Sequence, residues 1–219
     1  MTGRVSRPAR PSPRTWLFDF DGTLVDSVGL ILDSFRHATR TVLGRTLPEE
    51  ELLAGVGRPL IDQMRVLGGD RAQELYDVYR DHNLRRHADL LRPYAGVTPM
   101  LDGLRDRGCA IGIVTSKMRD TVLLGLEHVP LGRFDVVVTC EDTARHKPEP
   151  DPVRHGLELL DAHPDEAVYV GDSPYDLRAG RAAGVRTAAA LWGAAFPEAV
   201  LRAERPDREL RRPEEALAW

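Results

Sequence analysis

Residues 15–27 read TWLFDFDGTLVDS, and this segment decides the interpretation of the whole chain. Thr15–Phe18 is a short apolar run that stops at Asp19 and is followed by the turn residues Asp21-Gly22, a pattern typical of a buried strand. Two carboxylates therefore stand at the end of the first predicted strand. The preceding segment interleaves arginines with prolines, and we expect residues 1–14 to form a disordered tail.

Helical spacing follows this strand. Between residues 28 and 91, apolar positions recur every three or four residues and no strand pattern occurs. Helices are expected from Val28 to Gly44, from Pro48 onward, over Pro59–Leu67, and from Asp70 to Leu90. We expect residues 28–91, called the helical insert below, to form a small all-helical cap domain.

Strands and helices alternate after residue 92. Strands are expected over residues 110–114, 134–138, 167–170 and 185–191, the last of these being the final strand, with helices over 97–107, 118–128, 152–162 and 175–183. This alternation predicts a parallel sheet covered on both faces. The predicted fold is therefore α/β, a Rossmann-like core made of residues 15–27 and 92–219, with the helical insert placed after the first strand.

The composition excludes several classes of protein. Of the 219 residues, 42% are apolar and 29% are charged, which is the balance of a soluble globular chain. The formal net charge of -4 argues against a nucleic-acid partner, and no apolar stretch is long enough to cross a membrane. The two cysteines, Cys109 and Cys140, cannot form a disulfide framework. We expect a cytoplasmic protein, either a monomer or a weak homodimer.

Polar residues follow each of the first four predicted strands. Thr115-Ser116-Lys117 follows the second strand, Lys147 comes after the third, and Asp172 and Asp176 come after the fourth. Because ligands of parallel sheets bind beyond the carboxyl ends of the strands, these groups should converge with Asp19. Converging carboxylates repel one another unless cations compensate them, and carboxylate oxygens suit Mg²⁺. Lys117 and Lys147 are the only lysines among 30 basic residues.

Taken together, these segments resemble the four motifs of the haloacid dehalogenase (HAD) superfamily of phosphohydrolases. The resemblance extends from residue 15 to about residue 217. The helical insert is similar to the small cap of the phosphoglycolate phosphatase and β-phosphoglucomutase branch. The segments GIVTSKMRDTV (112–122), FDVVVT (134–139) and KPEPDP (147–152) resemble the bacterial HAD-type inorganic pyrophosphatases in particular.

The resemblance implies a Mg²⁺-dependent phosphohydrolase that acts through an aspartyl-phosphate. Asp19 would be the nucleophile, and the metal would be held by Asp19, the Asp21 backbone carbonyl and Asp172. Asp21 would protonate the leaving oxygen and later activate water. Asp176 would tune the metal, and Lys117 would lie at the rim of the site. The groups implied for phosphate binding are Gly22, Thr115, Ser116 and Lys147, of which Thr115 and Lys147 are also implied to be catalytic.

Two arginines bear on the choice of substrate. Arg58 lies in a Gly- and Pro-rich turn (residues 55–60), and with Arg119 it would favour a small substrate with two anionic groups. Pyrophosphate fits first and 2-phosphoglycolate second, with a β-phosphoglucomutase-like phosphotransferase as a further alternative. A catalytically silent binding or regulatory protein is the non-enzyme alternative. The alternative interpretation of residues 55–60 is an ordinary interhelical turn with a solvated Arg58.

Overall fold

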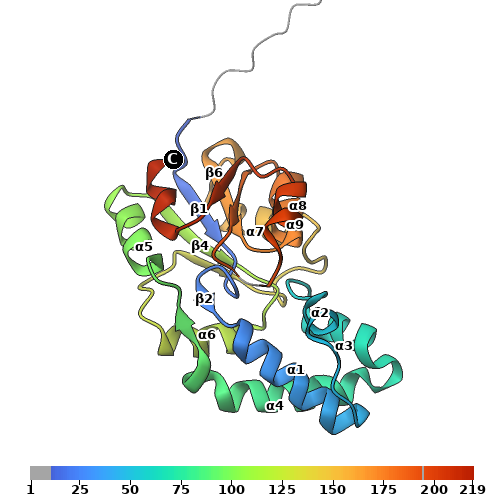
Figure 1. Ribbon diagram of the computed structural model, residues 1–219. Coiled ribbons are helices and arrows are strands. Elements are labelled where there is room, and N and C mark those ends of the chain that lie inside the picture. Colours follow the sequence, from blue (N-terminus) through green and yellow to red (C-terminus); the bar gives the residue numbers. More distant parts are fainter. Residues whose placement is uncertain (1–10, 194) are drawn as a thin grey trace, which may run out of the picture.

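The computed structural model describes residues 11–193 and 195–219 (Figure 1). Residues 1–10 of the expected tail lie outside the described residues. Arg14, also expected in the tail, is joined to the sheet by backbone hydrogen bonds. Its N–H donates to the Glu166 carbonyl at 2.8 Å, and its carbonyl accepts from the Ala110 N–H at 2.9 Å.

A six-stranded parallel sheet forms the centre of the molecule, in the order β5-β4-β1-β6-β7-β8. Its strands are β1 (Thr15–Phe18), β4 (Ala110–Val114), β5 (Val136–Val138), β6 (Ala167–Gly171), β7 (Arg186–Ala190) and β8 (Arg208–Leu210). The first strand, β1, is paired on both sides, so that Phe18 lies opposite Ile113 of β4 and Val170 of β6. The predicted α/β class is confirmed.

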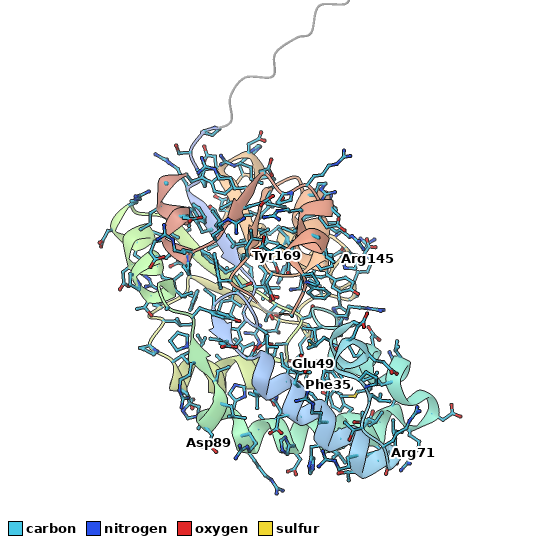
Figure 2. The ribbon with its side chains drawn as sticks, viewed as in Figure 1. Phe35, Glu49, Arg71, Asp89, Arg145 and Tyr169 are labelled. Atoms are coloured by element: carbon cyan, nitrogen blue, oxygen red, sulfur yellow. The ribbon has the colours of Figure 1, made fainter. Side chains whose placement is uncertain are left out.

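Helices cover both faces of this sheet. They are α5 (Val97–Asp106), α6 (Arg119–His128), α7 (Asp151–Leu159), α8 (Pro174–Ala183) and α9 (Glu198–Ala203). Side chains of β1 alternate between the two faces, as the strand pleat requires. Trp16 and Phe18 join the apolar cluster that includes α5, whereas Leu17 joins the cluster on the face of α7 and α8 together with buried Tyr169 (Figure 2).

The helical insert has an apolar core of its own. Its helices are α1 (Val28–Leu43), α2 (Glu49–Leu53), α3 (Leu60–Gly68) and α4 (Ala72–Leu90). Helices α1 and α4 pack side by side, and Phe35 of α1 contacts Tyr79 of α4 with ring centroids 4.8 Å apart (Figures 1 and 2). A two-stranded antiparallel ribbon of β2 (Val25–Asp26) and β3 (Arg92–Pro93) stands where the chain enters and leaves the insert.

Three strands were not predicted, namely the two short strands β2 and β3 and the edge strand β8. The expectation that residues 185–191 form the last strand is wrong, because α9, β8 and a 3-10 helix (Pro213–Ala218) follow. In β8, Arg208 and Glu209 are exposed and only Leu210 is buried. The sequence therefore contains no apolar run that would indicate this edge strand. Among the residues described, no helix is both long and apolar enough to cross a membrane.

Candidate active site

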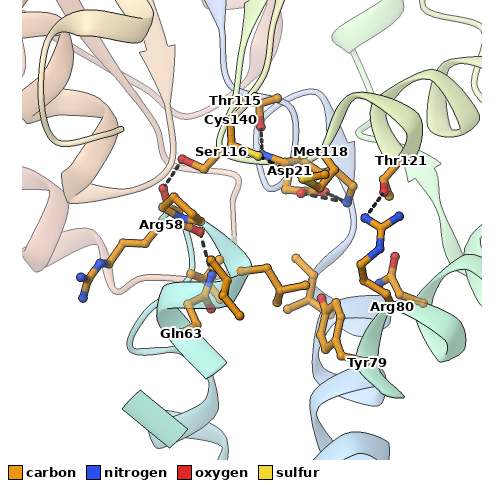
Figure 3. A pocket seen from close by; sticks show the side chains of 18 of the residues that line it. Asp21, Arg58, Gln63, Tyr79, Arg80, Thr115, Ser116, Met118, Thr121 and Cys140 are labelled. Atoms are coloured by element: carbon orange, nitrogen blue, oxygen red, sulfur yellow. Dashed lines mark hydrogen bonds and ion pairs between the residues drawn. The ribbon is translucent and has the colours of Figure 1, made fainter. Parts of the chain in front are cut away.

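A cavity of about 360 Å³ lies between the carboxyl ends of the strands and the helical insert (Figure 3). The sheet side contributes Asp19, Asp21, residues 115–118 and Asp172 to its wall. The insert covers it with side chains from α1, α3, α4 and the turn before α3. The groups that the sequence places at strand ends are therefore brought together at one site.

Lys147 is buried next to Asp19 of the cavity wall, and its other partners are buried as well. Its Nζ lies 2.6 Å from Asp176 Oδ1, 3.1 Å from Asp19 Oδ2 and 3.2 Å from the Tyr169 hydroxyl. That hydroxyl donates onward to the Val114 carbonyl at 2.6 Å. Burial alone would lower the pKa of Lys147, but the charges of Asp176 and Asp19 outweigh it and raise the pKa. Lys147 is therefore a fixed cation beside Asp19.

Asp176 is tied into the start of α8 by a capping box. Its Oδ2 accepts from the Ser173 N–H at 3.0 Å and from the Ser173 hydroxyl at 2.5 Å, and its own N–H donates to Ser173 Oγ at 3.2 Å. Its other oxygen, Oδ1, accepts from Lys147. Both oxygens are thus engaged, and Asp176 positions Lys147 and the helix.

The buried carboxylates of Asp19, Asp172 and Asp176 carry more negative charge than the neighbouring Lys147 ammonium neutralises. Single oxygens of Asp19, Asp172 and Asp176 lie within 4.8 Å of one another, and the Lys147 ammonium contacts two of these residues, Asp19 and Asp176. Burial, followed by the charge of Asp176, raises the pKa of Asp19 to about 7. The same two causes raise the pKa of Asp172 well above its ordinary value. Because Asp176 is already bound to Lys147 and Ser173, the carboxylate oxygens of Asp19 and Asp172 are the donors that fit a hard divalent cation such as Mg²⁺.

Gly22 makes room for Asp172 at this site. Its φ is +73°, and a Cβ built there would lie only 2.0 Å from Asp172 Oδ2. Thr23, the next residue, donates its hydroxyl to Asp172 Oδ1 at 3.1 Å. The turn after β1 thus holds the Asp172 carboxylate beside Asp19, whose Oδ1 accepts from the Phe20 N–H at 2.8 Å.

Asp21 is bound by Lys117 rather than by the acidic cluster. Lys117 Nζ lies 2.9 Å from both carboxylate oxygens, and both side chains are largely buried (Figure 3). Burial would raise the pKa of Asp21, but the charge and hydrogen bonds of Lys117 exceed it and lower the pKa. The scarcity of lysine in this chain pointed to Lys117, although nothing in the sequence indicated that Asp21 would be its partner.

Ser116 connects the core to the helical insert. Its hydroxyl donates to the Gly57 carbonyl at 2.8 Å (Figure 3). Near this contact, the Tyr175 hydroxyl donates to the Ala54 carbonyl at 3.4 Å. Gly57 has a φ of +97°, and a Cβ there would lie 2.9 Å from Ser173 Oγ, so the turn approaches the core closely. Thr115 lines the cavity directly, where its Oγ1 accepts from the Lys117 N–H at 3.3 Å.

The two arginines expected to bind substrate do not reach into the cavity in this structure. Arg58 stands at its edge, with an exposed guanidinium that points away from it (Figure 3). The guanidinium of Arg119 lies 2.6 Å from Asp142 Oδ2, and Arg119 is not part of the wall. Sequence reasoning missed Arg80 of α4, which does line the cavity. No signal in the polar sequence of α4 distinguishes it from the neighbouring arginines.

Comparison with known proteins identifies the family to which this chain belongs. A family model for haloacid dehalogenase-like hydrolases matches residues 16–190, most of the chain. The chain belongs to this family. It is 39% identical to Pyrophosphatase PpaX of Bacillus pumilus over 205 residues, 93% of this chain and 94% of the relative. It is also 40% identical to Pyrophosphatase PpaX of Bacillus cereus strain G9842 over 189 residues, 84% and 88% of the two chains.

Solved structures of haloacid dehalogenase-like proteins share the fold. A hydrolase of this family from Streptococcus pneumoniae superposes with a TM-score of 0.83 at 23% identity, covering 94% of this chain and 97% of the other. This haloacid dehalogenase-like hydrolase is therefore an enzyme of the phosphatase or pyrophosphatase type, and the expected enzyme class is confirmed.

Metal should stabilise the protein more at neutral than at acidic pH. Asp19, with its pKa near 7, and Asp172 hold protons in the folded state that the unfolded chain has already lost. The metal-free fold therefore loses stability as the pH rises from about 4 towards 7. Mg²⁺ bound by these carboxylates would compensate their charges, whereas protons would compete with it at low pH.

In thermal denaturation, Mg²⁺ at 100 times its dissociation constant should raise the Tm by about 5–10 °C at neutral pH, relative to chelator. The increase should be clearly smaller near pH 5. Asp172→Asn should abolish most of it. An equal increase at both pH values would contradict this expectation.

Proposed function

We propose that the protein is a Mg²⁺-dependent inorganic pyrophosphatase that works through a phosphorylated Asp19. The observation that carries the proposal is the 39–40% identity to proteins named Pyrophosphatase PpaX over most of both chains. The site supports it, because Asp19 lines the cavity and lies 3.1 Å from the Lys147 ammonium.

In the first step, an Asp19 carboxylate oxygen forms a bond to one phosphorus of pyrophosphate. The bond between that phosphorus and the bridging oxygen breaks, and phosphate leaves with the electron pair. Lys147 keeps its proton and stabilises the charge that develops on the phosphoryl oxygens, together with the Thr115 hydroxyl and nearby backbone N–H groups.

In the second step, water attacks the phosphorus of the aspartyl-phosphate. Asp21 accepts a proton from the water, the bond from phosphorus to Asp19 breaks, and a second phosphate is released with the Asp19 carboxylate restored. Mg²⁺, held by Asp19, Asp172 and the Asp21 backbone carbonyl, would reduce the repulsion between the carboxylate and the anionic substrate.

The contact between Asp21 and Lys117 favours an anhydride over an alkyl ester. Both oxygens of Asp21 accept from Lys117, so Asp21 must leave that contact before it can protonate a departing alkoxide. A departing phosphate is a much weaker base than an alkoxide and depends less on such a proton. The arrangement therefore suits pyrophosphate better than a sugar phosphate.

The test is phosphate release from a panel of substrates by the purified protein, with Mg²⁺ and with chelator. We expect kcat/KM for pyrophosphate to exceed that for 2-phosphoglycolate and for hexose phosphates by about tenfold or more, which corresponds to about 1.4 kcal/mol. Activity should vanish with chelator. A preference for 2-phosphoglycolate would overturn the substrate assignment and leave the phosphatase class intact.

A further inference from the structure

Pyrophosphate has two phosphoryl groups, and the residues around Asp19 account for only one of them. The second, distal group must lie further from the sheet, towards the helical insert, and it needs a cation there. Within the described residues, the lysine and arginine residues of the cavity wall are Arg58, Arg80 and Lys117.

Two of these three are poorly placed for the distal group. Lys117 is bound to both oxygens of Asp21 at 2.9 Å. Arg58 directs an exposed guanidinium away from the cavity (Figure 3). Arg80 is different, because its side chain is only 20% exposed and reaches from α4 across to the core.

The guanidinium of Arg80 is held in a defined orientation. Its Nη2 lies 2.6 Å from Asp120 Oδ2, and its Nη1 lies 3.5 Å from the Thr121 hydroxyl, which itself donates to Asp120 Oδ1 at 2.9 Å (Figure 3). The Tyr76 ring lies on another side, 5.8 Å from the guanidinium carbon. A guanidinium has five N–H donors and these two contacts use two of them, so Arg80, unlike Lys117, keeps several donors with which it can bind a phosphate.

The ion pair between Arg80 and Asp120 contributes too little stability to explain by itself why the Arg80 guanidinium is held in this orientation. The Asp120 side chain is 59% exposed, and pairs with such an exposed partner contribute little to stability. Thr121 and Arg80 both belong to the cavity wall, whereas Asp120 does not. Asp120 therefore contacts the guanidinium from outside the cavity wall, whereas Arg80 itself belongs to that wall.

We propose that Arg80 binds the distal phosphoryl group of pyrophosphate and that Asp120 positions its guanidinium. The proposal deepens the proposed function and rests on it. Arg80 belongs to the insert, and Asp19 and Lys147 belong to the core, so a substrate bound by both is held only while the two parts are together. Binding of the distal phosphate then favours closure of the insert over the site.

The test compares pyrophosphate with p-nitrophenyl phosphate, which has one phosphoryl group and no distal anion. Arg80→Gln should raise KM for pyrophosphate by about 10- to 100-fold, because it removes charge-assisted hydrogen bonds. Its kcat/KM for p-nitrophenyl phosphate should stay within about twofold of the wild type. Asp120→Asn should raise KM for pyrophosphate by a smaller factor and spare the aryl ester.

The matched control is Arg36→Gln. Arg36 is an arginine of the same insert that pairs with exposed Glu49 at 2.7 Å and lies outside the cavity wall, so both substrates should be unaffected. Equal losses with both substrates in Arg80→Gln would overturn the proposal and make Arg80 a closure residue. Unchanged KM for pyrophosphate would overturn it as well. A wild-type protein that hydrolyses the aryl ester but not pyrophosphate would instead refute the proposed function.

Discussion

An Asp19→Asn variant is expected to fold normally and to release phosphate at least about a thousandfold more slowly than the wild type. The amide keeps the size of the carboxylate but cannot attack phosphorus, so no phosphorylated intermediate forms. Burial and the charge of Asp176 disfavour a charged Asp19, as its raised pKa shows. Removing that charge should therefore leave the Tm of the metal-free protein unchanged or slightly higher.

Steady-state phosphate release and thermal denaturation together check this expectation. Asp89→Asn is a suitable control, since Asp89 is an exposed aspartate of α4 that pairs with Arg86 at 3.4 Å. It should retain wild-type activity. If folded Asp19→Asn kept a tenth of the wild-type rate, Asp19 would not be the nucleophile.

Lys147→Arg is expected to lower kcat by at least about 100-fold, even though the charge is kept. The Lys147 side chain is 1% exposed, with three polar partners within 3.2 Å, so a larger planar group has no space. Overpacking of this kind costs about 1–3 kcal/mol, which should lower the Tm by several degrees. Lys147→Met should be worse still for stability, because it leaves Asp19 and Asp176 without their cation.

The matched control is Arg145→Lys, two residues away. Arg145 is mostly exposed and pairs with Asp151 at 2.9 Å, and Figure 2 places it at the surface. Kinetics and Tm of the control should equal those of the wild type. Near-normal kinetics in Lys147→Arg would mean that the ammonium has no special place between carboxylate and phosphate.

The core of the site could be predicted because simple rules govern strand ends. A short apolar run that stops at Asp19 marks a buried strand, and parallel strands present their carboxyl ends at one edge. Those two facts bring Asp19, Thr115, Lys147 and Asp172 to one place, which is where the structure has them.

Side-chain contacts between elements that are distant in sequence could not be predicted. Arg80 meets Asp120 only because α4 packs against α6, and no periodicity in α4 specifies which of its polar side chains faces the core. The pairing of Lys117 with Asp21 depends in the same way on two loops that are adjacent in space but distant in sequence. Side-chain partners across such contacts follow from docking geometry rather than from local pattern.

The position of β1 in the middle of the sheet has a consequence for how the chain is made. β1 is among the first described segments to leave the ribosome, yet its partners β4 and β6 begin only at Ala110 and Ala167. At a translation rate of about 5–20 residues per second, β6 is synthesised roughly 8–30 s after β1, and β1 lacks this pairing partner until then. The helical insert, whose contacts are local, can fold during that interval. The nascent chain should therefore carry a folded insert beside an unpaired, aggregation-prone β1. Chaperones would recognise the nascent chain in this state.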